Sequence, residues 1–304
     1  MKNDKNALQY LQKYNIEKVI IPNNLSVIEE SAQISAIIES EDCLLFVLDV
    51  LENDQDKDYM QALKATGVKI LAITDDSNYR SINAHLIING NPNQQGIDYS
   101  KEVGRYLLGP QYFIMRPEYA DIEVNAPGPE VKRILVTMGG SDHNNLLFKI
   151  LKALQNMTYQ GSILIVTSEA SGYLDKLKQY VQTLSFNIDI KVDVKSLVPL
   201  WTQCDIAITA GGNTLFERIA TRLPGATICQ LDRQMEIADC FAGQDVNMNL
   251  GYGPDMTEGN IAKALSDFIA NRELHNKQYA ESPGILDGNG LQRVGEEIKI
   301  LVGR

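Results

Sequence analysis

The sequence has few cysteines and no long apolar run. Its cysteines, Cys43, Cys204, Cys229 and Cys240, form no C-x-x-C pair and have no histidine at zinc spacing, so neither a disulfide framework nor a zinc site is expected. No apolar stretch reaches the roughly 20 residues that a membrane span needs. Residues 1–6 are mostly polar and charged, which predicts no secretory signal and therefore a cytoplasmic protein.

Basic residues are also scarce. Lys and Arg number 28 against 39 Asp and Glu, which leaves a net charge of −11. Nucleic-acid grooves and anionic membranes require an excess of Lys and Arg, so neither is expected as a general partner. A small anion can still bind locally, through backbone N–H groups and helix N-termini. Hydrophobic residues make up 44% of the 304 residues, which excludes wholesale disorder, and this length predicts roughly two domains.

Short apolar runs alternate with helical patterns along the chain. In the first part we expect strands at residues 18–22, 43–50, 68–74 and 85–89, and helices at 27–39 and 56–66. In the second we expect strands at 133–138, 162–167, 188–192, 205–209 and 226–229, and helices at 144–155, 173–183, 197–202, 215–221, 235–243, 261–270 and 290–302. Residues 125–130, rich in Pro and Gly, are interpreted as a linker. The pattern predicts an α/β fold with two parallel-sheet domains, residues 1–127 and 128–304.

Two loops of the second half share one design, in which a buried strand ends in two glycines and a helix follows. The first contains Gly140 and Ser141, and the second contains Gly211, Gly212, Asn213 and Thr214. Glycine lets a ligand approach the backbone, and a helix start offers unpaired N–H groups to phosphate. Gly-Gly turns are common, but two of them at strand ends of one sheet indicate a ligand with a diphosphate. Neither loop fits the P-loop or the dinucleotide-binding pattern, which disfavours both classes.

Glu217 follows Asn213 by one helical turn, so the two side chains share a helix face. Its carboxylate can accept hydrogen bonds from both hydroxyls of a ribose. It can equally be an acid on a solvated face that only stabilises the start of the helix. Both interpretations stay open on the residues alone.

These segments resemble the C-terminal half of the GT-B fold of MurG-type glycosyltransferases, which use UDP-GlcNAc. More closely, the chain resembles the PseG/SpsG family of UDP-sugar hydrolases in pseudaminic and other nonulosonic acid synthesis. The resembling segments are residues 46–49, 67–76, 107–119, 134–145, 197–217 and 284–294, which include LLGPQYFIMRPEY and the closing DGNG motif. The resemblance implies two Rossmann-like domains facing a cleft, and attack of water on the anomeric carbon of a UDP-sugar with release of UDP.

The family's binding roles transfer to this chain position by position. By this resemblance the diphosphate lies against Gly140, Ser141, Gly211, Gly212, Asn213 and Thr214. Glu217 would hold the ribose, and Gln234 would match the glutamine of an Asn-Gln pair on the sugar side. Arg233 stands in place of that asparagine, where it can clamp a phosphate or carboxylate. Neither a cofactor nor a metal is implied.

The family's catalytic positions are not retained. The N-terminal G-x-G-H-x-x-R motif, whose histidine is thought to activate the water, is absent, and Leu51 replaces a family tyrosine. The N-terminal domain is therefore expected to be truncated and to lack its first βαβ unit. Because such a sheet exposes an edge, we expect a homodimer or a partner chain to cover it.

No residue is assigned as catalytic. Asp49 and Asp76 end predicted strands of the first domain, where they are candidate bases or metal ligands, or only satisfy nearby turns. His143 follows the first glycine loop and is either a general acid or a solvated loop residue. Three functions stay open: a UDP-sugar hydrolase with rearranged catalysis, a glycosyltransferase-like enzyme, or a nucleotide-sugar-binding protein without turnover.

Overall fold

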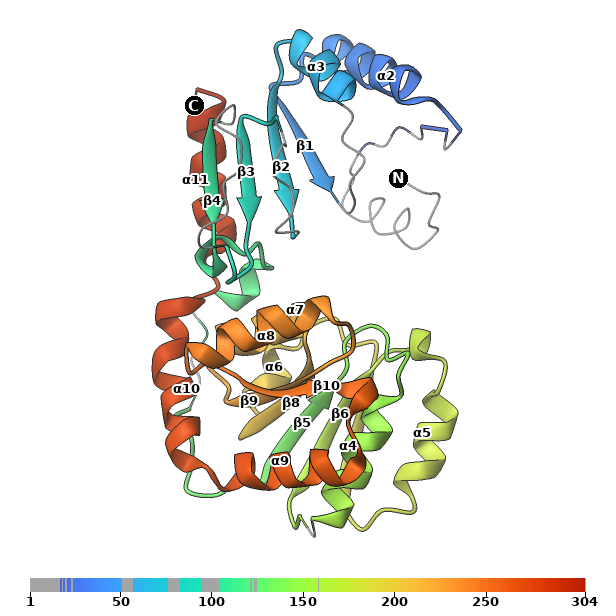
Figure 1. Ribbon diagram of the computed structural model, residues 1–304, viewed down its shortest axis with the longest axis vertical. Helices are drawn as coiled ribbons and strands as arrows, with labels where there is room; N and C mark the ends of the chain where they lie inside the picture. Colours follow the sequence, from blue (N-terminus) through green and yellow to red (C-terminus); the bar gives the residue numbers. More distant parts are fainter. Residues whose placement is uncertain are drawn as a thin grey trace. The chain divides into compact units, whose positions relative to one another are not determined.

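The computed structural model describes residues 17, 19, 21–22, 24–50, 57–75, 83–94, 104–120, 122, 125–157 and 159–303. The chain forms two compact α/β units, each built on its own sheet (Figure 1). Unit 1 comprises Met1–Asn89, Gly96–Leu107 and Glu296–Arg304, and unit 2 comprises Gly90–Gln95 and Leu108–Gly295. The predicted boundary at residue 127 differs from this division because residues 108–120 pack within unit 2.

Unit 1 contains a four-stranded sheet in the order β1 (Leu45–Val50), β2 (Lys69–Thr74), β3 (Leu86–Asn89) and β4 (Arg105–Leu108). Strands β1, β2 and β3 pair in parallel. Helix α2 (Val27–Ser40) begins with a reciprocal capping box between Ser26 and Glu29, and α3 (Lys57–Ala65) is followed by Gly67 in a left-handed conformation. The strand expected at residues 18–22 lies largely outside the described residues.

Unit 2 contains a six-stranded parallel sheet in the order β10-β9-β8-β5-β6-β7. The strands are β5 (Arg133–Thr137), β6 (Ser162–Thr167), β7 (Asn187–Val192), β8 (Ile206–Ala210), β9 (Gly225–Cys229) and β10 (Met248–Tyr252). Strands β6 and β7 extend the sheet on one side of β5, while β8, β9 and β10 extend it on the other. The order therefore reverses between β5 and β8, and at such a switch point open α/β sheets bind ligands.

The helices that follow β5 along the chain are α4 (Leu146–Asn156), α5 (Leu174–Val181), α6 (Val198–Trp201), α7 (Asn213–Ala220), α8 (Arg233–Gly243), α9 (Glu258–Ala270), α10 (Arg272–Ile285) and α11 (Gly290–Leu301). Helix α11 belongs to unit 1 from Glu296 onward. Short 3-10 turns lie at η1 (Pro110–Tyr112), η2 (Pro117–Tyr119), η3 (Glu169–Ser171) and η4 (Gly253–Asp255). None of the helices in the described part of the chain combines the length and the apolar character needed to cross a bilayer.

The unit 2 sheet has an apolar core on each face. Successive side chains of a strand point to opposite faces, so each strand contributes residues to both cores. On β5, Ile134 and Val136 pack with residues of α4, α5 and α9. Leu135, between them, packs with residues of α6, α7 and α8 on the other face. Two parallel-sheet α/β units confirm the predicted fold class. Strand β4, strand β10 and helix α10 had not been predicted.

Candidate functional site

The two glycine loops lie side by side at the switch point of the unit 2 sheet. Strands β5 and β8 pair so that Thr137 lies opposite Thr209, and each loop leaves its strand just beyond this pair. The structure thus brings the six loop residues predicted to contact phosphate to one edge of one sheet, as the sequence pattern required.

In the first loop, Asp142 closes the start of α4. Its carboxylate accepts hydrogen bonds from the backbone N–H groups of Leu146 at 2.8 Å and Leu147 at 2.9 Å, and from the Tyr173 hydroxyl at 3.3 Å. Free N–H groups were expected at the start of both helices, and for α4 this expectation is wrong because a buried side chain of its own loop occupies them. The exposed Gly140 and Ser141 stay predicted ligand contacts.

Gln230, which directly follows β9, ties the first loop to the neighbouring strand. Its buried side-chain amide donates to the carbonyl oxygen of Met138 at 2.8 Å and to that of Ser141 at 3.0 Å. The Asn144 side chain in turn donates to the Gln230 carbonyl at 3.1 Å. Sequence reasoning missed Gln230, although its position at the carboxyl end of a strand is the signal that identified the glycine loops.

The second loop leaves its helix uncapped. Gly212 is the N-cap residue of α7, and no side chain of the described residues caps the helix start. A Cβ at the buried Gly211 would lie 2.8 Å from Cβ of Gln234 and 3.2 Å from Sγ of Cys229, so glycine is required there for packing. The first N–H groups of α7 are therefore not occupied by a side-chain cap, unlike those of α4.

Gln234 lies against this second loop. Its Oε1 accepts the backbone N–H groups of Gln230 at 2.8 Å and Leu231 at 3.3 Å. A Cβ at Gly211 would lie 3.3 Å from Oε1 of Gln234 and a Cβ at Gly212 would lie 3.8 Å from Nε2, so the amide lies beside both glycines. The structure thus brings Gln234 to the predicted phosphate site, whereas Arg233, the first residue of α8, is exposed.

Glu217 lies partly buried on α7 beside the η2 turn. Burial raises the pKa of Glu217, and this rise is partly offset by the Tyr119 hydroxyl and the Arg116 guanidinium. Arg116 forms an ion pair with Glu118 at 3.0 Å and donates to the Lys195 carbonyl at 2.6 Å. Arg116 and Tyr119 were not predicted as site residues, although both belong to the segment 107–119 that carries the resemblance.

The DGNG motif packs against the segment 107–119. Gly288 has a φ of +79°, and a Cβ there would lie 2.2 Å from the Tyr119 carbonyl oxygen. A Cβ at Gly290 would lie 2.1 Å from the carbonyl oxygen of Phe113, whose ring stacks on Phe216 of α7 at 3.9 Å. The two segments that define the resemblance therefore pack directly on each other and on α7.

An ion pair fixes the DGNG motif. Nη1 and Nη2 of Arg293 donate to the two carboxylate oxygens of Asp287, and Nη1 also donates to the Gln111 carbonyl at 2.9 Å. These hydrogen bonds from Arg293 lower the pKa of Asp287 to about 2. Asp287 is therefore ionised at neutral pH and acts in structure rather than in proton transfer.

Arg218 anchors the other end of α7. It is fully buried and donates to the carbonyls of Leu223 at 3.0 Å and Val246 at 3.3 Å and to Oδ1 of Asn247 at 2.8 Å. Burial lowers the pKa of Arg218 to about 9, so the side chain stays charged at neutral pH. A cation at the carboxyl end of a helix interacts favourably with the helix dipole.

The roles proposed for the remaining candidates stay predictions. His143 is exposed in the first loop, and Asp49 is exposed near the end of β1 in unit 1. Asp76 and Leu51 lie outside the described residues. Among the residues whose positions are described, no three His, Cys, Asp or Glu side chains gather to hold a metal ion. The catalytic roles of these residues and the dimer at the first domain stay predictions.

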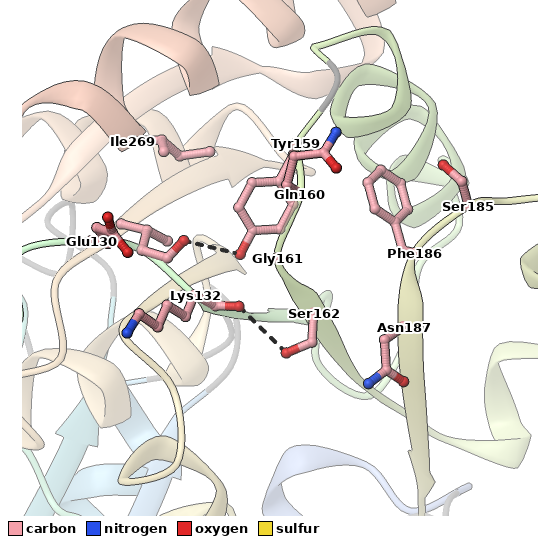
Figure 2. A pocket seen from close by; sticks show the side chains of 11 residues that line it. Glu130, Lys132, Tyr159, Gln160, Gly161, Ser162, Ser185, Phe186, Asn187 and Ile269 are labelled. Atoms are coloured by element: carbon pink, nitrogen blue, oxygen red, sulfur yellow. Dashed lines mark hydrogen bonds between the residues drawn. The ribbon is translucent and has the colours of Figure 1, made fainter.

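A hollow of about 810 Å³ opens at the opposite edge of the unit 2 sheet, where β5, β6 and β7 begin (Figure 2). Its wall includes the rings of Tyr159 and Phe186. The Tyr159 hydroxyl donates to the Val131 carbonyl at a long 3.4 Å, as does the Ser162 hydroxyl to the Lys132 carbonyl. None of the predicted site residues lines this hollow.

Comparison with known proteins identifies the architecture. No protein-family model matches the chain. MurG of Acinetobacter baumannii superimposes with a TM-score of 0.69 at 13% identity, over 96% of this chain and 88% of that one. The fold is the GT-B fold. The MnaA–UDP complex from S. aureus superimposes with a TM-score of 0.62 at 12% identity, over 99% and 87% of the two chains.

A comparison of sequences adds a relative from polysaccharide biosynthesis. The chain is 27% identical over 193 residues to the spore coat polysaccharide biosynthesis protein SpsG of Bacillus subtilis (strain 168), across 62% of this chain and 57% of the relative. The chain spans about half the length of the curated relatives it matches. It is thus a GT-B protein related in sequence to SpsG.

Proposed function

We propose that the chain binds a UDP-sugar at the carboxyl edge of the unit 2 sheet and processes it in surface-polysaccharide or nonulosonic acid synthesis. The observation that carries the proposal is the pair of glycine loops side by side at the switch point, one of which opens an uncapped helix. The diphosphate would lie against Gly211, Gly212, Asn213 and Thr214, with Gly140 and Ser141 beside it. Glu217 would accept hydrogen bonds from the ribose hydroxyls.

The reaction proposed is hydrolysis at the anomeric carbon. Water oxygen bonds to this carbon, the bond to the phosphate oxygen breaks, and UDP leaves with the electron pair. The chain's contribution would be N–H donors and the α7 dipole that stabilise the negative charge on the departing diphosphate. The general base for the water stays unassigned, and His143, in the first loop, is the candidate within unit 2. The SpsG name, with its polysaccharide role, and the UDP in the MnaA structure support this ligand class.

Calorimetric titration tests the binding step. UDP and UDP-GlcNAc should bind the full chain, and Glu217→Gln should weaken binding by about 10- to 100-fold, because it removes a charged acceptor of two hydroxyl donors. The matched control is Glu273→Gln, an exposed glutamate on α10, whose UDP affinity should equal that of the unchanged chain. If UDP, CDP and TDP all fail to bind, the proposed function is wrong.

Product analysis separates the three candidate reactions. Release of UDP from a UDP-sugar in water alone supports hydrolysis. Release that requires an added sugar or lipid acceptor supports glycosyl transfer instead. Tight binding of UDP-sugars without release under either condition supports a binding protein without turnover.

A further inference from the structure

A buried glutamine, Gln230, bonds to both ends of the first glycine loop. Its side chain is 8% exposed, and Nε2 donates to the carbonyl oxygen of Met138 at 2.8 Å and to that of Ser141 at 3.0 Å. A primary amide has two N–H hydrogens, so this side chain has no donor left for a ligand. Gln230 therefore acts on an anionic ligand through the loop that it holds, not by donating to it.

The two carbonyls bound by Gln230 enclose the N–H groups of Gly140 and Ser141. Residues 138–142 are joined by trans peptide groups, and each group is planar, so a fixed C=O also fixes the N–H on the other side of its plane. Gln230 holds the first and the last of these groups, and those between them carry the N–H groups of Gly140 and Ser141. Both residues are exposed, and no described residue accepts either N–H group. They are backbone donors that the first loop can still offer an anion, although Asp142 caps α4.

A second glutamine connects Gln230 to the other glycine loop. Oε1 of Gln234 accepts the backbone N–H of Gln230 at 2.8 Å, so it holds the residue from which the bonds to the first loop start. The same amide lies beside the second loop, where a Cβ at Gly211 would be 3.3 Å from Oε1. Asn144 adds a hydrogen bond to the Gln230 carbonyl at 3.1 Å. These contacts join the two loops through Gln230, so its side chain controls how the first loop lies beside the start of α7.

We infer that Gln230 is a positioning residue that presents the N–H groups of Gly140 and Ser141 to the diphosphate beside the start of α7. This inference rests on the proposed function. Hydrogen bonds from N–H groups to charged phosphate oxygens are strong, and they depend on the direction of the donor. A loop released from Gln230 would therefore bind the diphosphate less tightly. The nucleoside part of the ligand, which we place at Glu217, would not be affected.

Gln230→Met tests the inference, because methionine has nearly the length of glutamine but no N–H donor. The variant keeps the backbone bonds of residue 230 to Gln234 and Asn144 and loses the two bonds to the first loop. UDP affinity, measured by calorimetry on the full chain, should fall about 5- to 30-fold, since two charge-assisted hydrogen bonds lose their fixed direction. Uridine affinity, measured by NMR titration, should stay within about twofold, because uridine has no phosphate.

Gln278→Met is the matched control. Gln278 is 1% exposed, and its amide accepts the N–H of Gly225 at 2.6 Å and donates to the carbonyl of the same residue at 3.2 Å. It thus bonds to backbone at the amino end of β9, whereas Gln230 follows the carboxyl end of this strand. The control removes a buried amide of the same kind away from the loops. It should lower the stability in urea and leave the UDP affinity unchanged.

Backbone amide NMR signals of the nitrogen-15-labelled full chain give a second measurement. In the unchanged chain, UDP should shift the signals of Gly140 and Ser141 more than uridine does. In Gln230→Met these shifts should shrink, while the shift of the Gly212 signal stays. If Gln230→Met does not unfold cooperatively in urea, Gln230→Asn replaces it, because the shorter asparagine keeps an amide that cannot span the distance to both carbonyls.

Each outcome decides the inference. A loss of UDP affinity in the Gln230 variant, with uridine affinity unchanged and Gln278→Met normal, supports it. It is overturned, with the proposed function intact, if UDP and uridine weaken equally, if Gln278→Met loses as much UDP affinity, or if the Gln230 variant binds UDP normally. It is likewise overturned if UDP shifts neither Gly140 nor Ser141 in the unchanged chain, a result that needs no variant. No UDP binding by the unchanged chain overturns both.

Discussion

Helices α4 and α7 begin in the same way, after a buried strand and two glycines, yet they are held at opposite ends. Helix α4 is fixed at its start, where Asp142 occupies two N–H groups. Helix α7 is fixed at its other end, where Arg218 bonds to two carbonyls and an amide oxygen beyond the helix. Each charge lies at the helix end that its sign favours.

The difference teaches that a shared loop motif does not imply a shared role. A helix anchored by its carboxyl end can leave its first N–H groups for a ligand without losing its position. A helix anchored at its start has already used these groups. We therefore expect α7 to bind the ligand and α4 to shape the loop beside it.

The largest effect should come from Arg218→Ala. The substitution removes the guanidinium that donates to the carbonyls of Leu223 and Val246, leaves Asn247 Oδ1 with the Thr227 hydroxyl as its donor, and creates a cavity, so the free energy of unfolding should fall by about 3–5 kcal/mol. Urea denaturation measures this. Arg233→Ala, at an exposed position of α8, should change stability by less than about 0.5 kcal/mol. Equal effects of the two substitutions would refute the anchoring role of Arg218.

Asp142→Ala should have the next largest effect. It removes the partner of two helix N–H groups and of the Tyr173 hydroxyl, so we expect a loss of about 2–3 kcal/mol in urea denaturation. Asn213→Ala changes the equivalent end of α7, where no side chain caps the helix, and should change stability by less than about 0.5 kcal/mol. A costly Asn213→Ala would mean that the two helix starts are not different.

Substitutions at Gly211 and Gly140 should also differ in their effect on stability. Gly211→Ala places a methyl group 2.8 Å from Cβ of Gln234 and should cost about 1–3 kcal/mol, because a packed core resists added atoms. A Cβ at Gly140 meets nothing within 4 Å, so Gly140→Ala should be neutral or stabilise by up to about 1 kcal/mol. Thermal unfolding of the two variants compares their stabilities. A Gly140→Ala variant less stable than Gly211→Ala would contradict the packing described for the second loop.

Much of the fold follows from the sequence, because strands such as β6 and β8 are continuous apolar runs between turns. Strand β10 and helix α10 were not predicted, because their segments lack this contrast between apolar runs and polar turns. Strand β10 contains Asn249 and Gly251 at a bulge, and α10 is polar, carries Pro283 and is therefore weakly patterned. Tertiary packing compensates: on α10, the Gln278 side chain accepts the Gly225 N–H at 2.6 Å and donates to its carbonyl at 3.2 Å.

Site residues could be predicted only where the signal lies within a few neighbouring residues of the sequence. The glycine loops and Glu217 are visible because each depends on neighbours within one turn of helix. The capping by Asp142 was missed because the same short segment is compatible with a free or an occupied helix start. Tyr119 was missed as a site residue because it reaches the site from another element, and no spacing in the chain encodes that contact. Gln230 was missed although it follows a strand, because it carries no glycine motif.

Gly288 and Gly290 lie so close to the backbone of residues 113–120 that neither position has room for a side chain. Any side chain at Gly290 would push the Phe113 carbonyl, 2.1 Å from the would-be Cβ, and with it the ring stacked on α7. A random mutagenesis screen for lost ligand binding should therefore recover substitutions in this short carboxyl-terminal turn, through its packing on residues 113–120.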